Sequence, residues 1–211
     1  MILLLKGKKR TMSNIVKEFE TRLMLTESEY FEIVSHFMRL NPNKKFLKNV
    51  NVYFDTDDLY LKNNHSTLRV RIINDVKCEL TLKISCSNGD DEINDYINHA
   101  QADALINNSV FPEGNVKSYL LTLPYHLESY KVITTLNNMR LEIENDDHLL
   151  VIDKNSYGDI IDYNLEIEAN NSIEDAKKWM KVYMARFNLA VPTKKYVGKA
   201  HRAINAALNK D

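Results

Sequence analysis

Charged side chains at every second position are the feature that most restricts the fold of this chain. The stretch Glu18-Phe19-Glu20-Thr21-Arg22 places two carboxylates and a guanidinium on one face of an extended segment, because successive side chains of a β-strand point to opposite faces. Alternation of this kind in a single strand is typical of any half-buried strand with one solvated face. Here, however, the charged pattern recurs in four further stretches: 67–72, 79–83, 139–144 and 162–168.

Like charges that share a strand face repel each other unless other groups lie between them. Glu18 with Glu20 and Arg69 with Arg71 are such pairs, and Glu, Asp and Lys are depleted in ordinary strands. A sheet that closes into a barrel resolves the repulsion, because its charged faces turn inward and its apolar faces lie under helices. An open sheet with one wet face explains the same pattern, and periodicity alone does not separate the two.

The other segments predict an α+β protein. A capping box formed by Thr26 and Glu29 opens a helix that ends near Leu40,. Further helices are expected at 99–122, in two pieces broken around 112–114, at 172–187 and after the basic segment 194–202. The polar stretch 85–91 is expected to be a loop, and Asn137-Asn138 a hairpin turn between two strands,.

The charged residues and the cysteines limit which binding partners and which cellular compartment are expected. The 28 Lys and Arg residues nearly balance the 29 Asp and Glu residues, so no general attraction to nucleic acid or to an anionic membrane is expected. Cys78 and Cys86 indicate free thiols in a reducing cytoplasm rather than a disulfide framework. The sequence does not determine the oligomeric state, and a homodimer is compatible with it.

The first eleven residues differ from the rest of the chain in their pattern of apolar and basic residues. The apolar run 1–5 is too short for a signal-peptide core or a membrane span, and basic residues follow it rather than precede it,. Residues 1–11 are therefore expected to be a disordered arm or an over-extended reading of the gene, with Met12 as the natural start. Residues 12–211 are expected to form a single domain.

The charged faces also suggest a chemistry. Two carboxylates on a rigid strand, such as Glu18 and Glu20, are suited to share a hard divalent cation such as Mg2+ or Mn2+,. Arginine forks bind phosphate oxygens. Carboxylate, divalent cation, phosphate and arginine together are a combination typical of phosphoryl transfer.

In this combination the chain resembles the CYTH domain family, also called triphosphate tunnel metalloenzymes. Glu18-Phe19-Glu20-Thr21-Arg22 is similar to the family's ExExK signature, and the likeness extends from about Val16 to Asn205, closest to small CYTH proteins of Gram-positive bacteria that are often labelled adenylate cyclases. The other motifs follow in the family's order: Tyr53-Phe54-Asp55-Thr56, Thr67-Leu68-Arg69-Val70-Arg71, Leu80-Thr81-Leu82-Lys83 and Tyr163-Asn164-Leu165-Glu166-Ile167-Glu168. The resemblance implies an eight-stranded antiparallel β tunnel with helices packed outside.

The resemblance also implies site residues. The metal ligands would be Glu18, Glu20, Glu166 and Glu168, joined by Asp153, with Glu142 and Glu144 as further acidic lining. The triphosphate would be held by Arg69, Arg71, Lys83, Arg140 and Lys195, with Lys194 and Lys199 as weaker candidates. Tyr53 is interpreted as a packing residue, with a place in the tunnel lining as the alternative, and His201 is interpreted as a surface residue.

Arg22 stands where the family usually has lysine. Arg22 is grouped with Glu18 and Glu20 as catalytic, but an arginine stays protonated and cannot act as a base. The leading hypothesis is a metal-dependent triphosphatase acting on inorganic triphosphate or on an organic or nucleoside triphosphate. The alternatives are a class IV-type adenylate cyclase, a non-catalytic sensor of triphosphate or nucleotide, and an interaction domain with a wet sheet.

Overall fold

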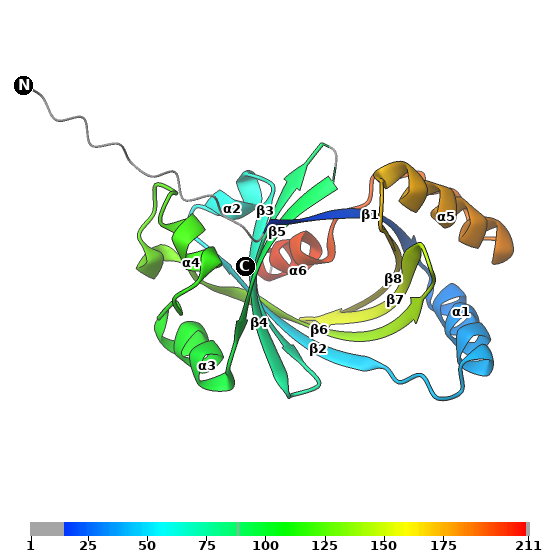
Figure 1. The fold of residues 1–211 in the computed structure, drawn as a ribbon, viewed down its shortest axis with the longest axis horizontal. Coiled ribbons are helices and arrows are strands. Elements are labelled where there is room, and N and C mark those ends of the chain that lie inside the picture. Colours follow the sequence, from blue (N-terminus) through cyan, green and yellow to red (C-terminus); the bar gives the residue numbers. More distant parts are fainter. Residues whose placement is uncertain (1–14, 88, 210–211) are drawn as a thin grey trace, which may run out of the picture.

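The computed structural model describes residues 15–87 and 89–209, which form a closed antiparallel barrel with helices around it (Figure 1). The strand order around the barrel is β1-β5-β4-β3-β2-β6-β7-β8. The strands are β1 (Ile15–Leu25), β2 (Leu47–Asp55), β3 (Ser66–Ile73), β4 (Lys77–Cys86), β5 (Gly89–Ile97), β6 (Lys131–Glu144), β7 (His148–Tyr157) and β8 (Ile160–Ala169). The helices are α1 (Glu27–Leu40), α2 (Tyr60–Asn63), α3 (His99–Asn108), α4 (Asn115–Leu120), η1 (Leu127–Ser129), α5 (Ile173–Arg186) and α6 (Lys199–Leu208).

Strand β1 closes the barrel by pairing with a different neighbour along each half. Residues from Ile15 to Glu18 pair with β5, and residues from Phe19 to Leu25 pair with β8. The start of β5 lies very close to β1 at Gly89, which has a φ of +110° and where a Cβ atom would meet the Glu18 carbonyl at 2.6 Å. A glycine is therefore required here, and the close approach brings the acidic face of β1 beside that of β5.

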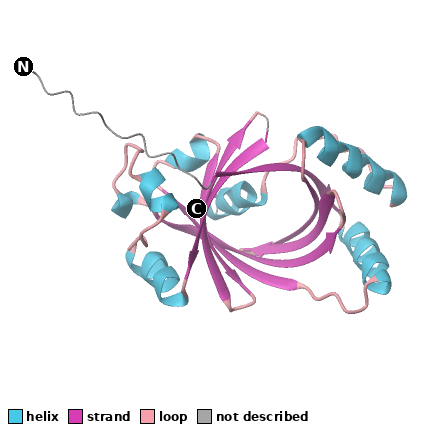
Figure 2. Cartoon of the chain, in the orientation of Figure 1, coloured by secondary structure: helices cyan, strands magenta, loops and turns pink. Residues whose placement is uncertain are grey.

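The apolar faces of the strands point outward and are covered by helices (Figure 2). Helices α1 and α5 pack on one side of the barrel, where Ile33 and Met180 join the outer residues of β1, β6, β7 and β8. On the other side α2, α3 and α4 cover β2 to β5 through residues such as Leu61, Leu105 and Val116. The expected closed, eight-stranded α+β tunnel with its charged faces inward is confirmed.

Helix α6 differs from the others because it packs on inward-facing side chains. Ala203 and Ile204 contact Tyr53, Leu136 and Tyr157, which belong to β2, β6 and β7. Arg202 of the same helix pairs with Asp162 on β8, with Nε–Oδ2 at 2.7 Å. The C-terminal helix therefore occupies part of the barrel interior and limits the space left for a ligand.

Two boundary predictions were wrong. Asn137 and Asn138 form no hairpin turn but lie within the continuous strand β6, because buried Asn138 finds partners on both neighbouring strands. Its side chain bonds Asn49 on β2 and Asn155 on β7, each at 3.0 Å. The stretch 85–91 is likewise mostly strand, since β4 runs to Cys86 and β5 begins at Gly89.

Helix 26–40 and the two-piece helix 99–122 are found nearly as predicted, with the capping box of Thr26 and Glu29 present. Both cysteines are free thiols, Cys78 buried and Cys86 exposed. Among the described helices none is long and apolar enough to cross a membrane. The prediction for residues 1–11 falls outside the described residues.

Candidate active site

A charged cavity of about 390 Å³ lies inside the barrel. Its wall follows from strand alternation, because residues two apart on a strand point to the same side. Eight carboxylates line it: Glu18, Glu20, Glu79, Asp90, Glu92, Glu142, Glu166 and Glu168. Six cationic side chains join them: Arg22, Arg69, Arg71, Lys83, Arg140 and Lys199. A ligand in this cavity would meet both signs of charge.

Three of the carboxylates are placed to hold one metal ion. Glu20 of β1 lies opposite Glu168 of β8 in the strand register, and one carboxylate oxygen from each of Glu20, Glu166 and Glu168 lies within 4.8 Å of the others. Burial, together with the nearby Glu166, raises the pKa of Glu168 despite Arg140. Converging carboxylates that crowd in this way fit a hard divalent cation, whose oxygen ligands carry negative charge.

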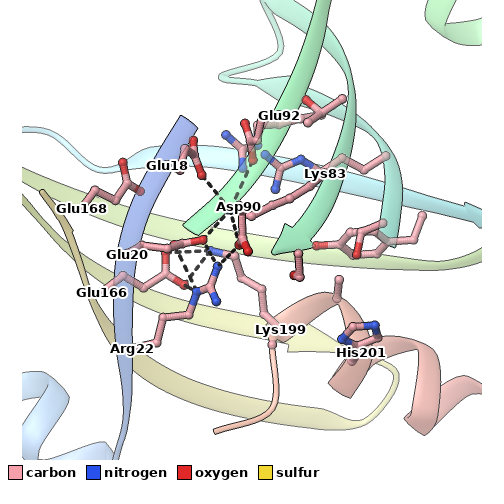
Figure 3. A pocket seen from close by; sticks show the side chains of 18 of the residues that line it. Glu18, Glu20, Arg22, Lys83, Asp90, Glu92, Glu166, Glu168, Lys199 and His201 are labelled. Atoms are coloured by element: carbon pink, nitrogen blue, oxygen red, sulfur yellow. Dashed lines mark hydrogen bonds and ion pairs between the residues drawn. The ribbon is translucent and has the colours of Figure 1, made fainter. Parts of the chain in front are cut away.

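Lys83 holds a second group of carboxylates together (Figure 3). Its Nζ lies 2.6 Å from Glu18, 3.2 Å from Asp90 and 3.3 Å from Glu92, and it also contacts Glu20. Burial opposes ionisation of Glu92, but the charges of Arg69 and Lys83 outweigh it and lower the pKa of Glu92 to about 2. In this arrangement Lys83 neutralises acids from β1 and β5.

Arg22 lies between the two acidic groups. Its guanidinium contacts Glu20 and lies 3.6 Å from carboxylate oxygens of both Asp90 and Glu166. The Tyr196 ring centroid is 5.9 Å from its central carbon, within cation–π range. A planar fork can reach several carboxylates at once, which the compact ammonium of a lysine does less well.

A buried ion cluster lies behind the metal-ligand group. Arg140 donates to Asp153 from Nε at 2.9 Å and to Glu166 from Nη2 at 3.0 Å, and Lys199 reaches Asp153 at 2.8 Å. Burial disfavours the charge on Asp153, yet Arg140 and Lys199 hold its pKa well below its usual range. Glu166 is affected in the same way, and Lys199 lowers its pKa to about 2. Asp153 thus fixes two cations and does not line the cavity.

Arg69 and Arg71 of β3 are the lining cations that make no ion pair with a carboxylate among residues 15–87 and 89–209. Arg71 Nε donates to Asn51 at 3.2 Å, while Glu79, opposite Arg71 in the register, accepts from Thr81. Burial, then Arg69 and Arg140, lower the pKa of Arg71 to about 10. Two guanidinium groups in one wall that make no direct ion pair within the described residues indicate an anion-binding region,.

The structure places most of the predicted residues in the cavity. Glu18, Glu20, Arg22, Arg69, Arg71, Lys83, Arg140, Glu142, Glu166 and Glu168 all line it. Lys194 and Lys195 are exposed and lie outside the lining, as does Glu144, which is paired with Lys44 at 3.6 Å. Lys199, which was a weaker candidate than Lys195 for binding triphosphate, lines the cavity. The interpretation of His201 as a surface residue was wrong, because His201 lines the cavity. Tyr53 also lines the cavity.

Asp90, Glu92 and Tyr196 were missed by sequence reasoning. The alternation of Asp90, Glu92 and Asn94 within β5 is visible in the sequence, but treating 85–91 as a loop concealed its first member. Tyr196 precedes α6 in an irregular segment, where no periodicity indicates which way a side chain points.

Comparison with known proteins agrees with this geometry. The family model described as "CYTH domain" matches residues 16–194. The chain belongs to the CYTH domain family. A CYTH relative from Bacillus subtilis (strain 168), named "Putative triphosphatase YjbK", is 33% identical over 165 residues, which is 78% of this chain and 84% of that protein.

Solved structures of similar proteins share the fold. A Bacillus halodurans protein described as "a putative adenylate cyclase" is 28% identical, with a TM-score of 0.79 over 89% of this chain and 97% of that one. HpAC1 from Hippeastrum, described as a "Putative adenylyl cyclase" that "reveals a dominant triphophatase activity", is 20% identical, with a TM-score of 0.72 over 90% and 95% of the two chains. At that identity the second likeness concerns the fold alone.

Proposed function

We propose that this CYTH protein is a divalent-metal-dependent triphosphatase whose first substrate is inorganic triphosphate. One observation carries the proposal: a single cavity contains a three-carboxylate group on β1 and β8 and unpaired arginines on β3. Strands β3 and β8 are four positions apart in the ring of eight, so the two groups lie on opposing walls. A polyanion and a cation can then bind between them.

Each group has a role in that reaction. Glu20, Glu166 and Glu168 would hold the cation, with Glu18 close by, and Mg2+ or Mn2+ suits these oxygen ligands,. A bound divalent cation neutralises phosphate charge and orients the reacting groups. Arg69 and Arg71 would bind phosphate oxygens, and the positive charges of Lys83 and Arg140 would neutralise negative charge on the phosphate oxygens in the transition state. Arg22 positions Glu20 and Glu166 and is not the base.

The named relative supports the same activity, since YjbK carries a triphosphatase name and aligns over most of its length. The cyclase descriptions among the solved structures define the rival, in which the same cavity cyclises ATP. We further propose a cytoplasmic location, supported by the two free cysteines,. We also propose that nucleic acid is not a ligand, because the net charge is only −1,.

Release of orthophosphate from inorganic triphosphate with Mg2+ or Mn2+ tests the function. Glu20→Gln and Glu168→Gln should each lower metal-dependent turnover at least about 100-fold, on the order of a lost metal ligand or its direct partner. The matched control is Glu144→Gln, because Glu144 is also a strand glutamate but is exposed.

The same assay separates the alternatives when ATP replaces triphosphate and the products are identified. Cyclic AMP with pyrophosphate would favour a cyclase. Tight metal-dependent binding of triphosphate without turnover would favour a sensor. Full activity of Glu20→Gln would contradict the metal assignment.

A further inference from the structure

Two buried donors in the wall of the cavity find no acceptor in the described chain, although the Arg69 guanidinium interacts with the Tyr53 oxygen. The Tyr53 hydroxyl and the Arg69 Nε are both without an acceptor, although the Tyr53 side chain is only 1% exposed. The two residues face each other directly in the pairing of β2 with β3, and both line the cavity. Native proteins leave few buried donors unpaired, so an acceptor is expected to come from a ligand.

The first turn of α6 reaches the same cavity. Gly198, Lys199, Ala200 and His201 line it. The first bond within the helix runs from the Arg202 N–H to the Gly198 carbonyl at 2.9 Å, so the preceding N–H groups have no acceptor inside the helix. Gly198, at the N-cap, has no side chain to satisfy them. The positive end of this ten-residue helix therefore faces the cavity,.

These two features belong to one continuous wall. Ala203 and Ile204, in the second turn of α6, pack on Tyr53. Arg69 and Arg71 beside this wall make no ion pair with a carboxylate in the part of the chain that the structure describes, although Glu79 and Glu92 also line the cavity. Donors from a hydroxyl, a guanidinium and a helix N-terminus, with two arginines outside any ion pair of the described residues beside them, are suited to phosphate oxygens,.

We propose that the Tyr53 hydroxyl, the Arg69 Nε and the first-turn amides of α6 form a subsite for one phosphate group of the substrate. The identity of the ligand as a triphosphate rests on the proposed function. Tyr53 is then a binding residue rather than only a packing residue, and α6 contributes its backbone as well as Lys199. Because all the donors come from the protein, the subsite should bind without a metal ion.

Tyr130 provides a matched control for Tyr53. Its side chain is fully buried, and its hydroxyl also has no partner among the described residues. It lies, however, in the outer apolar cluster with Phe111 and Leu120 and does not line the cavity. Tyr130→Phe therefore removes the same atom from the same kind of environment, without removing a cavity donor.

Isothermal titration with inorganic triphosphate, in EDTA so that turnover is suppressed, compares these variants. Tyr53→Phe should weaken triphosphate binding roughly 10-fold, the scale of one hydrogen bond to a charged group. Tyr130→Phe should bind like the wild type. Equal affinity of Tyr53→Phe and the wild type, or no triphosphate binding by the wild type, would overturn the proposal.

A second variant tests the helix amides independently of Tyr53. Gly198 has φ −56° and ψ 144°, an extended conformation that N-cap residues adopt,, and a Cβ there would meet nothing nearer than the His201 ring nitrogen at 3.8 Å. In Gly198→Asp the new carboxylate should cap the helix and compete with phosphate. The melting temperature should not fall, while triphosphate affinity falls at least roughly 10-fold, which is the loss expected when an anion's N–H donors are taken up. Unchanged affinity would exclude the amides from the subsite.

Orthophosphate in a parallel titration distinguishes substrate from product. A loss confined to orthophosphate would make this a product site and overturn the proposal, whereas a loss for triphosphate supports it. The outcome is separable from that for the proposed function. If triphosphate binding depends on Tyr53 but no hydrolysis occurs, the subsite is supported and the triphosphatase proposal is rejected. If hydrolysis occurs but binding does not depend on Tyr53, the triphosphatase proposal is supported and the subsite is rejected.

Discussion

The arginines that line the cavity fall into two classes that differ in their effect on the stability of the fold. Arg140 is enclosed by Asp153 and Glu166, and these charges raise its pKa well above the usual value although burial opposes this. Arg71 has only an amide partner, and burial beside Arg69 and Arg140 lowers its pKa to about 10. A lowered pKa of a base means that the fold disfavours its charged form at neutral pH. The charged Arg71 side chain should therefore lower the free energy of unfolding of the ligand-free protein, and binding of an anionic ligand should offset this loss.

Replacing the two arginines should therefore have opposite effects on the free energy of unfolding. Arg71→Met should raise it by about 1–3 kcal/mol, because it removes a charge that desolvation disfavours and that no ion pair among the described residues offsets,. The same variant should weaken triphosphate binding by about 1–3 kcal/mol. Arg140→Met should lower the free energy of unfolding by about 3–5 kcal/mol, since Asp153 and Glu166 lose their partner. Urea unfolding measures both, and a loss of stability in Arg71→Met equal to that in Arg140→Met would contradict the distinction.

Glu92 should make the fold sensitive to acid. Its pKa is lowered from 4.5 to about 2 in the folded protein. A carboxyl group with a lowered pKa stabilises the fold above its unfolded pKa, and this contribution is lost as the pH falls through the folded value. Between pH 4.5 and about 2, Glu92→Gln should therefore lose stability less steeply than the wild type,. It should also be less stable at pH 7.

Thermal unfolding across this pH range is the measurement, with Glu144→Gln as the control that keeps the wild-type slope. Equal slopes for Glu92→Gln and the wild type would show that Glu92 is not ionised more readily in the fold than in the unfolded chain.

Lys195 and Lys199 show where residue-level prediction from the sequence stops. Both belong to one basic segment, and no pattern separates them. The structure does, because α6 begins at Lys199 and turns its side chain toward Asp153 and Glu166, whereas Lys195 precedes the helix and is exposed. Which of several lysines enters a cavity depends on where a helix begins inside a barrel, and this is a tertiary property.

At the scale of elements, a row of hydrogen-bonded asparagine side chains crosses the barrel interior from β2 through β6 and β7 to β8. Asn49, Asn138 and Asn155 are all buried and bonded in sequence, and Asn155 continues to Asn164 at 2.8 Å. Asn138 and Asn155 each accept from one neighbour and donate to the next, while Asn49 donates to Asn138, so the loss of Asn138 leaves buried groups unsatisfied,.

Two neighbouring asparagines allow this row to be tested. Asn138→Ala should lower the free energy of unfolding by about 1–3 kcal/mol, because Asn49 and Asn155 lose a partner inside the barrel. Asn137→Ala should change it by less than about 0.5 kcal/mol, since Asn137 is exposed on the same strand,. Urea titration of the two variants gives the comparison, and equal losses would mean that the row does not stabilise the barrel.

The same strand shows why element boundaries were harder to predict than element types. Alternation correctly indicated strands on both sides of Asn137 and Asn138, but paired asparagines favour turns when only local sequence is considered. Hydrogen bonds to Asn49 and Asn155, which are distant in sequence, override that preference. The capping box at Thr26 needed no such partner, and the helix it opens was predicted nearly to the residue.

At the scale of the whole molecule, closure of the sheet converts repulsion on strand faces into a site. Acidic β1 and β8 are neighbours through the register of Glu20 with Glu168, whereas the arginines of β3 lie on the far side of the ring. The sequence alone predicted inward charges as one of two arrangements. Resemblance to the CYTH family favoured closure, and the strand order establishes it.

The location of Mn2+ in crystals grown with inorganic triphosphate tests the central claim most directly, because anomalous scattering from the metal identifies its ligands without reference to activity. The prediction is a Mn2+ ion bound by oxygens of Glu20, Glu166 and Glu168, with triphosphate oxygens reaching from it toward Arg69 and Arg71. A metal ion found only on the outer surface, or triphosphate bound away from both arginines, would contradict it.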